Sequence, residues 1–337
     1  MNRTDGNPGN GDDRKAIGRR FLRRGSRLKP VWLVGLVALA AAWVTLPILR
    51  RFESRPTVIL YASQDQVYAE PILKAFERGT GIRVRSVFDS EAAKTVALAN
   101  RLLAERRHPQ CDVLWGNEEF RTRQLAAAGV FREANGWTTF GYRSRRLVLA
   151  ANASNLPPVR SLLDLTNAAF RGRVALAYPM FGTTATHFLA LRQHWGKSNW
   201  LDWCRAFAAN KPFLVDGNSA AARFVARGEV VVALTDSDDI AAEVREGARI
   251  LALPMTAETL LLPNTVAVIR GCPHPQAAQR LFDYLCQPEV IAQLVAVRAL
   301  EGSSMADVTT LTLQPDWNAL LLDLEPATAA MKRIFRR

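Results

Sequence analysis

The sequence predicts an α/β fold of two lobes, each a sheet flanked by helices, preceded by a segment that crosses a membrane. Short apolar runs rich in β-branched residues alternate with helical patterns from Thr57 to Ile334, and this order is typical of parallel sheets covered on both faces. About 280 residues follow the linker at 50–56, which is enough for two hydrophobic cores. Nineteen uncharged residues, Val31–Leu49, precede that linker.

Buried strands are expected where a short run of Val, Ile and Leu lies between turn residues. These runs are Thr57–Ala62, Ile82–Phe88, Asp112–Trp115, Leu147–Ala151, Arg173–Tyr178, Glu229–Leu234 and Thr259–Ile269.

Helices are expected between these strands and after the last of them. The first has Pro71 near its start and ends at Gly79 and Gly81, because glycine and proline punctuate helices. The second is capped by Ser90 and ends near Arg107. The third follows the strand Asp112–Trp115 and ends at Gly129. The remaining helices are expected at Thr184–Trp195, Trp200–Ala209, Asn218–Arg227, Asp238–Glu246, Pro275–Cys286, Glu289–Val297 and Trp317–Ile334.

The uncharged run Val31–Leu49 has about the length needed to cross the hydrocarbon core of a bilayer. Eight Lys and Arg residues between Arg14 and Lys29 precede it, so the positive-inside rule keeps the basic arm 1–30 in the cytoplasm and exports the rest. Pro47–Arg51 offers no small-x-small cleavage site. We therefore expect an uncleaved anchor on the periplasmic face of a bacterial cytoplasmic membrane; the alternative is a cleaved signal peptide and a periplasmic protein.

The net charge of +13 does not indicate a nucleic-acid partner. Residues 1–56 hold twelve Lys and Arg against four Asp and Glu, so +8 of the charge lies around the anchor and +5 is spread over the rest. Charge in this position acts on membrane topology and on anionic lipid.

The four cysteines, Cys111, Cys204, Cys272 and Cys286, lack the Cys-x-x-Cys spacing of a zinc site. An oxidising periplasm permits a Cys272–Cys286 disulfide. Separate, half-buried thiols are the other interpretation.

Polar residues gather directly after the predicted strands, where ligands bind in open α/β sheets beside helix N-termini. In the first half the candidate ligand-binding residues are Asp65, Ser90, Glu91, Asn117, Glu118 and Glu119. In the second half they are Gly182, Thr183, Thr184, Asn218, Ser219, Asp236, Asp238 and Asp239. We expect these turns to face one cleft.

Helix capping explains several of these residues without a ligand. Ser90, Ser219 and Asp236 suit N-cap positions, and acids such as Glu118 and Asp238 suit first helical turns. One cap does not require three acids between positions 236 and 239, however, and Gly182 before two threonines resembles an anion-binding nest.

The sequence shows no catalytic constellation. The four histidines, His108, His187, His194 and His274, lack a metal-binding or triad-like context, and no Gly-x-x-x-x-Gly-Lys loop is present. Trp195, Trp200 and Trp203 are expected to pack in the core. We therefore expect a binding protein without a cofactor rather than an enzyme.

Several segments resemble periplasmic solute-binding proteins of ABC importers, in the branch that includes ferric-ion-binding proteins. The stretch from LYASQDQVYAEPILKAFERGTGIRVRSVFDSEAAK to CDVLWGNEE resembles the opening of that family. RGRVALAYPMFGTTAT, VDGNSAAARFVARGEVVVALTDSDD and LLPNTVAVIRGCPHPQAAQRLFDYLCQPEV follow in the family's order. The resemblance covers about residues 57–300.

The resemblance implies a type II-like periplasmic-binding-protein fold that closes over a solute. The first lobe would comprise residues 57–152 and 258–337, and the second lobe residues 153–257. In ferric binders a histidine, a glutamate and two adjacent tyrosines hold the metal, with phosphate or carbonate completing the shell. Here those positions would hold Asp65, Glu118 (or Asn117), and Asp238 with Asp239, while Gly182, Thr183, Thr184, Asn218 and Ser219 would contact the anion.

The resemblance therefore implies a monomeric substrate-binding component that delivers its solute to ABC permease and ATPase subunits. The expected cargo is a metal ion such as ferric iron with a synergistic anion, since hard cations accept carboxylates. A small organic phosphate, phosphonate or amine is the alternative ligand. A periplasmic sensor domain on the same fold is the alternative function.

Overall fold

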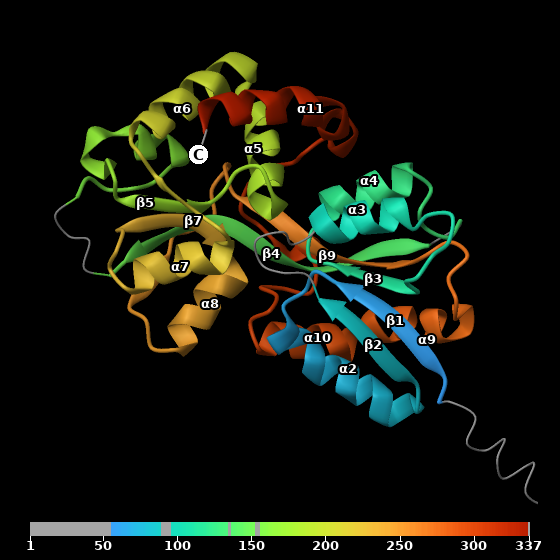
Figure 1. Cartoon of the computed structure of the whole chain (residues 1–337). Helices are drawn as coiled ribbons and strands as arrows, with labels where there is room; N and C mark the ends of the chain where they lie inside the picture. The colour runs from blue at the N-terminus through green and yellow to red at the C-terminus, as the bar shows by residue number, and fades with distance from the viewer. Residues whose placement is uncertain (1–54, 89–95, 134–135, 152–155, 336–337) are drawn as a thin grey trace, which may run out of the picture. The chain divides into compact units, whose positions relative to one another are not determined.

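The computed structural model describes residues 55–88, 96–133, 136–151 and 156–335 (Figure 1). The predicted anchor Val31–Leu49 and the site candidates Ser90 and Glu91 lie outside these ranges. Within them, no helix combines the length and the apolar character that a membrane span requires.

The strands of the described residues form one mixed sheet in the order β2-β1-β3-β9-β4-β7-β5-β6, with β8 beside β4. The strands are β1 (Thr57–Ala62), β2 (Arg83–Phe88), β3 (Val113–Gly116), β4 (Trp137–Ala150), β5 (Val174–Ala177), β6 (Phe213–Val215), β7 (Val232–Asp236), β8 (Ile250–Ala252) and β9 (Leu260–Val268). β1 pairs in parallel with β2 and β3, and β5 pairs in parallel with β6 and β7.

The prediction of purely parallel sheets is wrong at β4 and β9. These strands run antiparallel to each other and to β7 and β3, so they join the two parallel groups. We call β1–β3 and the helices that follow them the first lobe, and β5–β8 and their helices the second lobe. The predicted mixed α/β architecture in two lobes is confirmed, although hydrogen bonding makes the sheet continuous.

The helices cover both sides of this sheet (Figure 1). They are α2 (Gln66–Thr80), α3 (Val96–Ala104), α4 (Glu119–Ala127), α5 (Gly182–Trp195), α6 (Lys197–Ala209), α7 (Asn218–Ala226), α8 (Ser237–Arg245), α9 (Pro275–Leu285), α10 (Pro288–Ala296) and α11 (Trp317–Ile334). Short 3₁₀ turns lie at Leu162–Thr166, Ala168–Phe170 and Met305–Asp307.

The C-terminal helix α11, which the resemblance assigns to the first lobe, contacts α5 and α6 of the second lobe as well as α4. Its residues Leu320 and Met331 are buried in the same apolar cluster as Trp200 and Phe207. Trp203 stacks on Phe207, so Trp200 and Trp203 have the packing role expected of them. The predicted boundaries between the lobes stay a prediction.

An irregularity in the long strand β4 positions the later site. Phe140 pairs with Asn264 and Arg143 pairs with Leu262, so two residues of β4 oppose the single residue Pro263 of β9. Proline has no N–H to donate to a strand ladder and is confined within sheets to edges and bulges. The backbone N–H and C=O of Tyr142 bond instead to Gly302 and Glu301. The bulge follows from Pro263.

All four cysteines have free thiols. A Cys272–Cys286 disulfide, one of the two interpretations of the sequence, is therefore absent. Cys111 and Cys204 are fully buried, and Cys272 and Cys286 are partly buried. Burial raises the pKa of the Cys286 thiol to about 11, which keeps it protonated at neutral pH.

Candidate functional site

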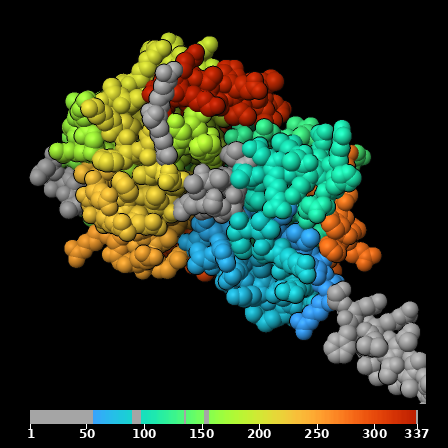
Figure 2. Space-filling model, viewed as in Figure 1, coloured from blue at the N-terminus to red at the C-terminus, as the bar shows by residue number. Residues whose placement is uncertain are grey.

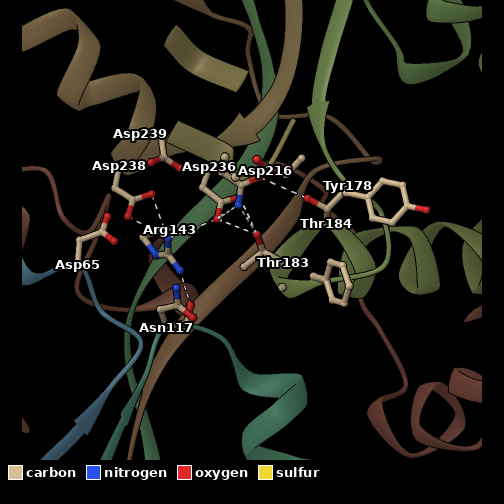
Figure 3. A pocket seen from close by; sticks show the side chains of 15 residues that line it. Asp65, Asn117, Arg143, Tyr178, Thr183, Thr184, Asp216, Asp236, Asp238 and Asp239 are labelled. Carbon is tan, nitrogen blue, oxygen red and sulfur yellow. Dashed lines mark hydrogen bonds and ion pairs between the residues drawn. The ribbon is translucent and has the colours of Figure 1, made fainter. Parts of the chain in front are cut away.

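A pocket between the two lobes collects the turns that follow β1, β3, β5, β6 and β7 (Figure 3). Its cavity volume is about 50 Å³, which is room for only a few water molecules. Five carboxylates and one guanidinium line it, together with hydroxyl and amide groups. The charged residues are Asp65, Asp216, Asp236, Asp238, Asp239 and Arg143.

Arg143 lies at the centre of this pocket, between Asp238 and Asn117 (Figure 3). Its Nη1 donates to both carboxylate oxygens of Asp238 at 3.0 and 2.9 Å and approaches Asp236 at 3.5 Å. Its Nη2 donates to the backbone carbonyl of Asn117. Because Asn117 belongs to the first lobe and Asp238 to the second, this guanidinium connects the two lobes.

Arg145, two residues further along β4, holds the second-lobe side of the pocket. Its guanidinium is fully buried and donates to Asp236 at 2.6 Å and to Asn218 and Thr184 at 2.7 Å. Thr183 donates to Asp236 at 2.8 Å. The side chains expected to receive an anion are thus bonded to one another, and they fix the shape of this wall.

Burial and charge act in opposite directions on these groups. Burial raises the pKa of Asp238 to about 6, although the neighbouring Arg143 opposes that shift. Burial disfavours the charged form of Arg143, but Asp238 and Asp236 outweigh it and raise the pKa of this guanidinium. For Arg145 burial prevails over Asp236, and the pKa is lowered. The acids of the lining outnumber the bases, since five carboxylates surround the one guanidinium of Arg143, and Arg145 lies behind the wall.

Asp236, Asp238 and Asp239 form a group that a metal ion could use. One carboxylate oxygen from each lies within 4.8 Å of the others, and all three side chains are buried. Asp65 lies across the pocket at the start of α2, where its charge acts on Asp238. Carboxylate oxygens are ligands for hard cations such as Ca²⁺, Mg²⁺ and Fe³⁺.

Glu118 has a different environment. Its side chain is fully buried and accepts hydrogen bonds from the backbone N–H groups of Phe120 and Arg121, which begin α4. The hydroxyl of Thr186 donates to it at 3.0 Å. Burial raises the pKa of Glu118. Glu118 therefore caps a helix and contacts α5 from beneath the pocket, and it is not among the residues that line the cavity.

The first turn of α5 lies at the wall of the pocket. Gly182 is its first residue and has φ +56°, a conformation that favours glycine. Gly182, Thr183 and Thr184 all line the cavity. The first N–H groups of a helix have no partner within the helix, so they can receive an anion.

The structure brings most of the predicted site residues together. Those that line the pocket are Asp65, Asn117, Gly182, Thr183, Thr184, Asn218, Asp236, Asp238 and Asp239. Three described candidates do not line it: Glu118, Glu119, whose carboxylate pairs with Arg123, and Ser219, which is partly buried in α7. Of the four predicted metal ligands, Glu118 is the one set apart from the cavity.

Sequence reasoning missed Arg143 and Arg145. The predicted strand began at Leu147, whereas β4 begins at Trp137. Two signals could have found the arginines: their spacing of two residues, which places them on one face of a strand, and Pro263, which indicates a bulge in the partner strand. Tyr178 and Asp216 also line the pocket, and the hydroxyl of Tyr178 donates to the carbonyl of Phe335.

The family of bacterial extracellular solute-binding proteins matches residues 57–296. This chain belongs to that family. The major ferric iron-binding protein of Neisseria meningitidis is 24% identical over 285 residues, which cover 77% of this chain and 84% of that protein. This relative is named as a binding protein.

Solved structures with the same fold cover 83% of this chain. Iron-bound HitA from Pseudomonas aeruginosa has a TM-score of 0.71 at 20% identity, with 99% of its own chain covered. AfuA from Actinobacillus pleuropneumoniae, solved with fructose-6-phosphate, has a TM-score of 0.67 at 19% identity, with 96% covered. At these identities the likeness shows the fold, which is that of periplasmic binding proteins, and leaves the ligand open.

Proposed function

We propose that this chain is the membrane-tethered solute-binding component of an ABC importer and that it carries a metal ion with an anion. The observation that carries the proposal is the cluster of Asp236, Asp238 and Asp239, whose oxygens lie within 4.8 Å of one another in a pocket shared by both lobes. The negative excess of the lining favours a cation of high charge.

The neighbouring N-terminus of α5 supports the anion part of the proposal. Its N–H groups and the positive end of its dipole face the same cavity as the acids. A cavity of about 50 Å³ suits an ion with a small oxyanion better than a sugar phosphate. Ferric iron is the first candidate, because the Neisseria relative is named as a ferric iron-binding protein.

The test is a thermal-shift and calorimetric titration of the chelator-treated full chain. Ferric nitrilotriacetate, Ca²⁺ and Mg²⁺ are added with and without phosphate, and we expect the melting temperature to rise most with ferric ion and phosphate together. The control is the variant Asp202→Asn with Asp283→Asn, which removes two exposed carboxylates elsewhere. The absence of stabilisation by any of these ions, with or without phosphate, would rule out metal cargo.

Arg143 favours a second candidate ligand, a small organic molecule that bears an amine and a phosphate or phosphonate. The guanidinium already bonds to Asp238 and Asp236, so part of the negative charge is balanced before a ligand arrives. Calorimetry on chelator-treated protein with phosphoethanolamine separates the two candidates. Binding without metal supports the organic ligand, and heat that appears only after iron is added supports the metal.

A further inference from the structure

Three exposed arginines surround one recess at the beginning of the first lobe. Arg55, Arg83 and Arg85 line it together with Thr57 and Glu77, and its cavity volume is about 470 Å³. β1 and β2 are parallel, and Thr57 pairs with Arg83. Arg83 and Arg85 are two residues apart on the edge strand β2, which places them on one face. The three guanidinium groups therefore share one surface.

No described carboxylate forms an ion pair with these arginines. The acid that lines the recess, Glu77, accepts a hydrogen bond from the backbone N–H of Val84 at 2.7 Å. Arg78, in the last turn of α2, is exposed nearby in the chain and also lacks an ion pair among the described residues. Elsewhere exposed arginines such as Arg101, Arg205 and Arg270 do have carboxylate partners. Among the described residues that line the recess, three guanidinium groups outnumber one carboxylate, so this lining has a net positive charge.

This arginine face lies where the chain enters the first lobe. The uncharged run ends at Leu49 and Arg55 follows six residues later, a distance of at most about 20 Å in an extended chain. β1 and β2 both start at this end and point toward the second lobe (Figure 1). The blue surface of the first lobe is exposed there (Figure 2). Asp65, which lines the pocket, follows the opposite, carboxyl end of β1.

We propose that the face formed by Arg55, Arg83 and Arg85 rests on the anionic phospholipid headgroups of the membrane that anchors the chain. The proposal depends on the proposed anchor and not on the identity of the cargo. Guanidinium groups bind phosphate oxygens through paired N–H donors. A short linker keeps the face within reach of those headgroups. The contact leaves the pocket, at the far ends of β1 and β2, directed away from the bilayer.

The test uses the full chain in lipid nanodiscs made of phosphatidylcholine alone or with phosphatidylglycerol. Hydrogen exchange of the backbone amides at 77–85 is expected to slow in the anionic discs at low salt and to return to the neutral-disc rate at high salt, because salt screens such contacts. The variant Arg55→Gln, Arg83→Gln, Arg85→Gln is expected to lose this protection. Each arginine accounts for about a fivefold change in the ratio of docked to undocked protein.

The matched control removes three exposed arginines from the second lobe, Arg173→Gln, Arg227→Gln and Arg249→Gln, and is expected to keep the protection. Equal exchange in both lipids, or equal loss in both variants, would overturn the proposal. So would the same protection in phosphatidylcholine discs after inorganic phosphate is added, because the ligand would then be free phosphate. Co-elution of the chain with the discs tests the anchor separately, and iron titration tests the cargo.

Discussion

The turn that begins α4 and the turn that begins α8 look alike in the sequence but do different things in the structure. Each follows a buried strand and opens a helix with adjacent acids, Glu118-Glu119 in one and Asp238-Asp239 in the other. The carboxylate of Glu118 accepts hydrogen bonds from two backbone N–H groups of α4 and from the hydroxyl of Thr186. The carboxylate of Asp238 faces the cavity and the guanidinium of Arg143.

The difference arises from the position of each acid in its turn and from the neighbouring strand. Glu118 is the N-cap residue of α4, and its side chain accepts from the N–H groups of its own helix. Asp238 lies one position inside α8, after Ser237. The N-cap of α8, Asp236, makes no such cap bond and turns instead to Arg145, Thr183 and Asn218. A carboxylate that caps its own helix, such as that of Glu118, is not available to a ligand. The carboxylates at the start of α8 line the cavity instead.

The largest effect is expected from removing Arg143, which pairs with Asp238 in the α8 turn and also donates to the carbonyl of Asn117 before α4. Arg143→Gln leaves Asp236 and Asp238 buried with one guanidinium fewer, so we expect the free energy of unfolding to fall by about 3–5 kcal/mol. Urea denaturation of the ligand-free protein measures this. Stability equal to that of the natural chain would mean that the ion pair has no net role.

The next effect concerns cation binding at the α8 turn. Asp238→Asn with Asp239→Asn removes two of three clustered carboxylates, and we expect the affinity for the cation to fall about 100-fold, which corresponds to about 2.7 kcal/mol. Asp239→Asn alone, which keeps the pair between Asp238 and Arg143, is the milder variant. Unchanged affinity in the double variant would show that the acids are not ligands.

The reciprocal experiment is made at the α4 turn. Glu118→Ala leaves the N–H groups of Phe120 and Arg121 and the hydroxyl of Thr186 without their acceptor, and we expect a loss of about 2 kcal/mol in the free energy of unfolding. Cation affinity, measured by calorimetry below the melting temperature, is expected to stay within about twofold. If the affinity fell as far as it does in the variant with Asp238→Asn and Asp239→Asn, Glu118 would have to be counted among the cation ligands.

The smallest effect is the pH dependence of the ligand-free protein. Because the pKa of folded Asp238 is raised to about 6, the folded state retains a proton that the unfolded chain releases near the ordinary value of about 3.9. The stability from this group is fully present below that ordinary value and is lost as pH rises through about 6. We expect Asp238→Asn to remove roughly 1–2 kcal/mol of this dependence; parallel stability curves for the two proteins would contradict it.

Local patterns predicted the elements and most of the pocket lining. α11 was predicted at its observed bounds. Within each parallel group the turns meet because the strands end at a common edge, which explains Asp65 with Asn117 and Gly182 with Asn218 and Asp236. That the two groups line one pocket depends on the antiparallel strands β4 and β9, which join them. Short strands such as β6 and β8 were missed, since three residues give no periodicity. Arg143 was missed because its position depends on pairing with β9, about 120 residues away along the chain. The role of Glu118 depends in part on Thr186, 68 residues further along the chain.

The bulge opposite Pro263 determines which side chains of β4 meet the solute. Side chains alternate along a strand, and one extra residue reverses that alternation beyond the insertion. Phe140 and Arg143 therefore share a face, although an uninterrupted strand would place Tyr142 and Ser144 there. If β4 paired with β9 without the bulge and kept all of its residues, the hydroxyl of Ser144 would take the place of the Arg143 guanidinium at the centre of the cavity. The net charge of the pocket therefore depends on the bulge in β4, which turns Arg143 toward the cavity, as well as on the acids that line it.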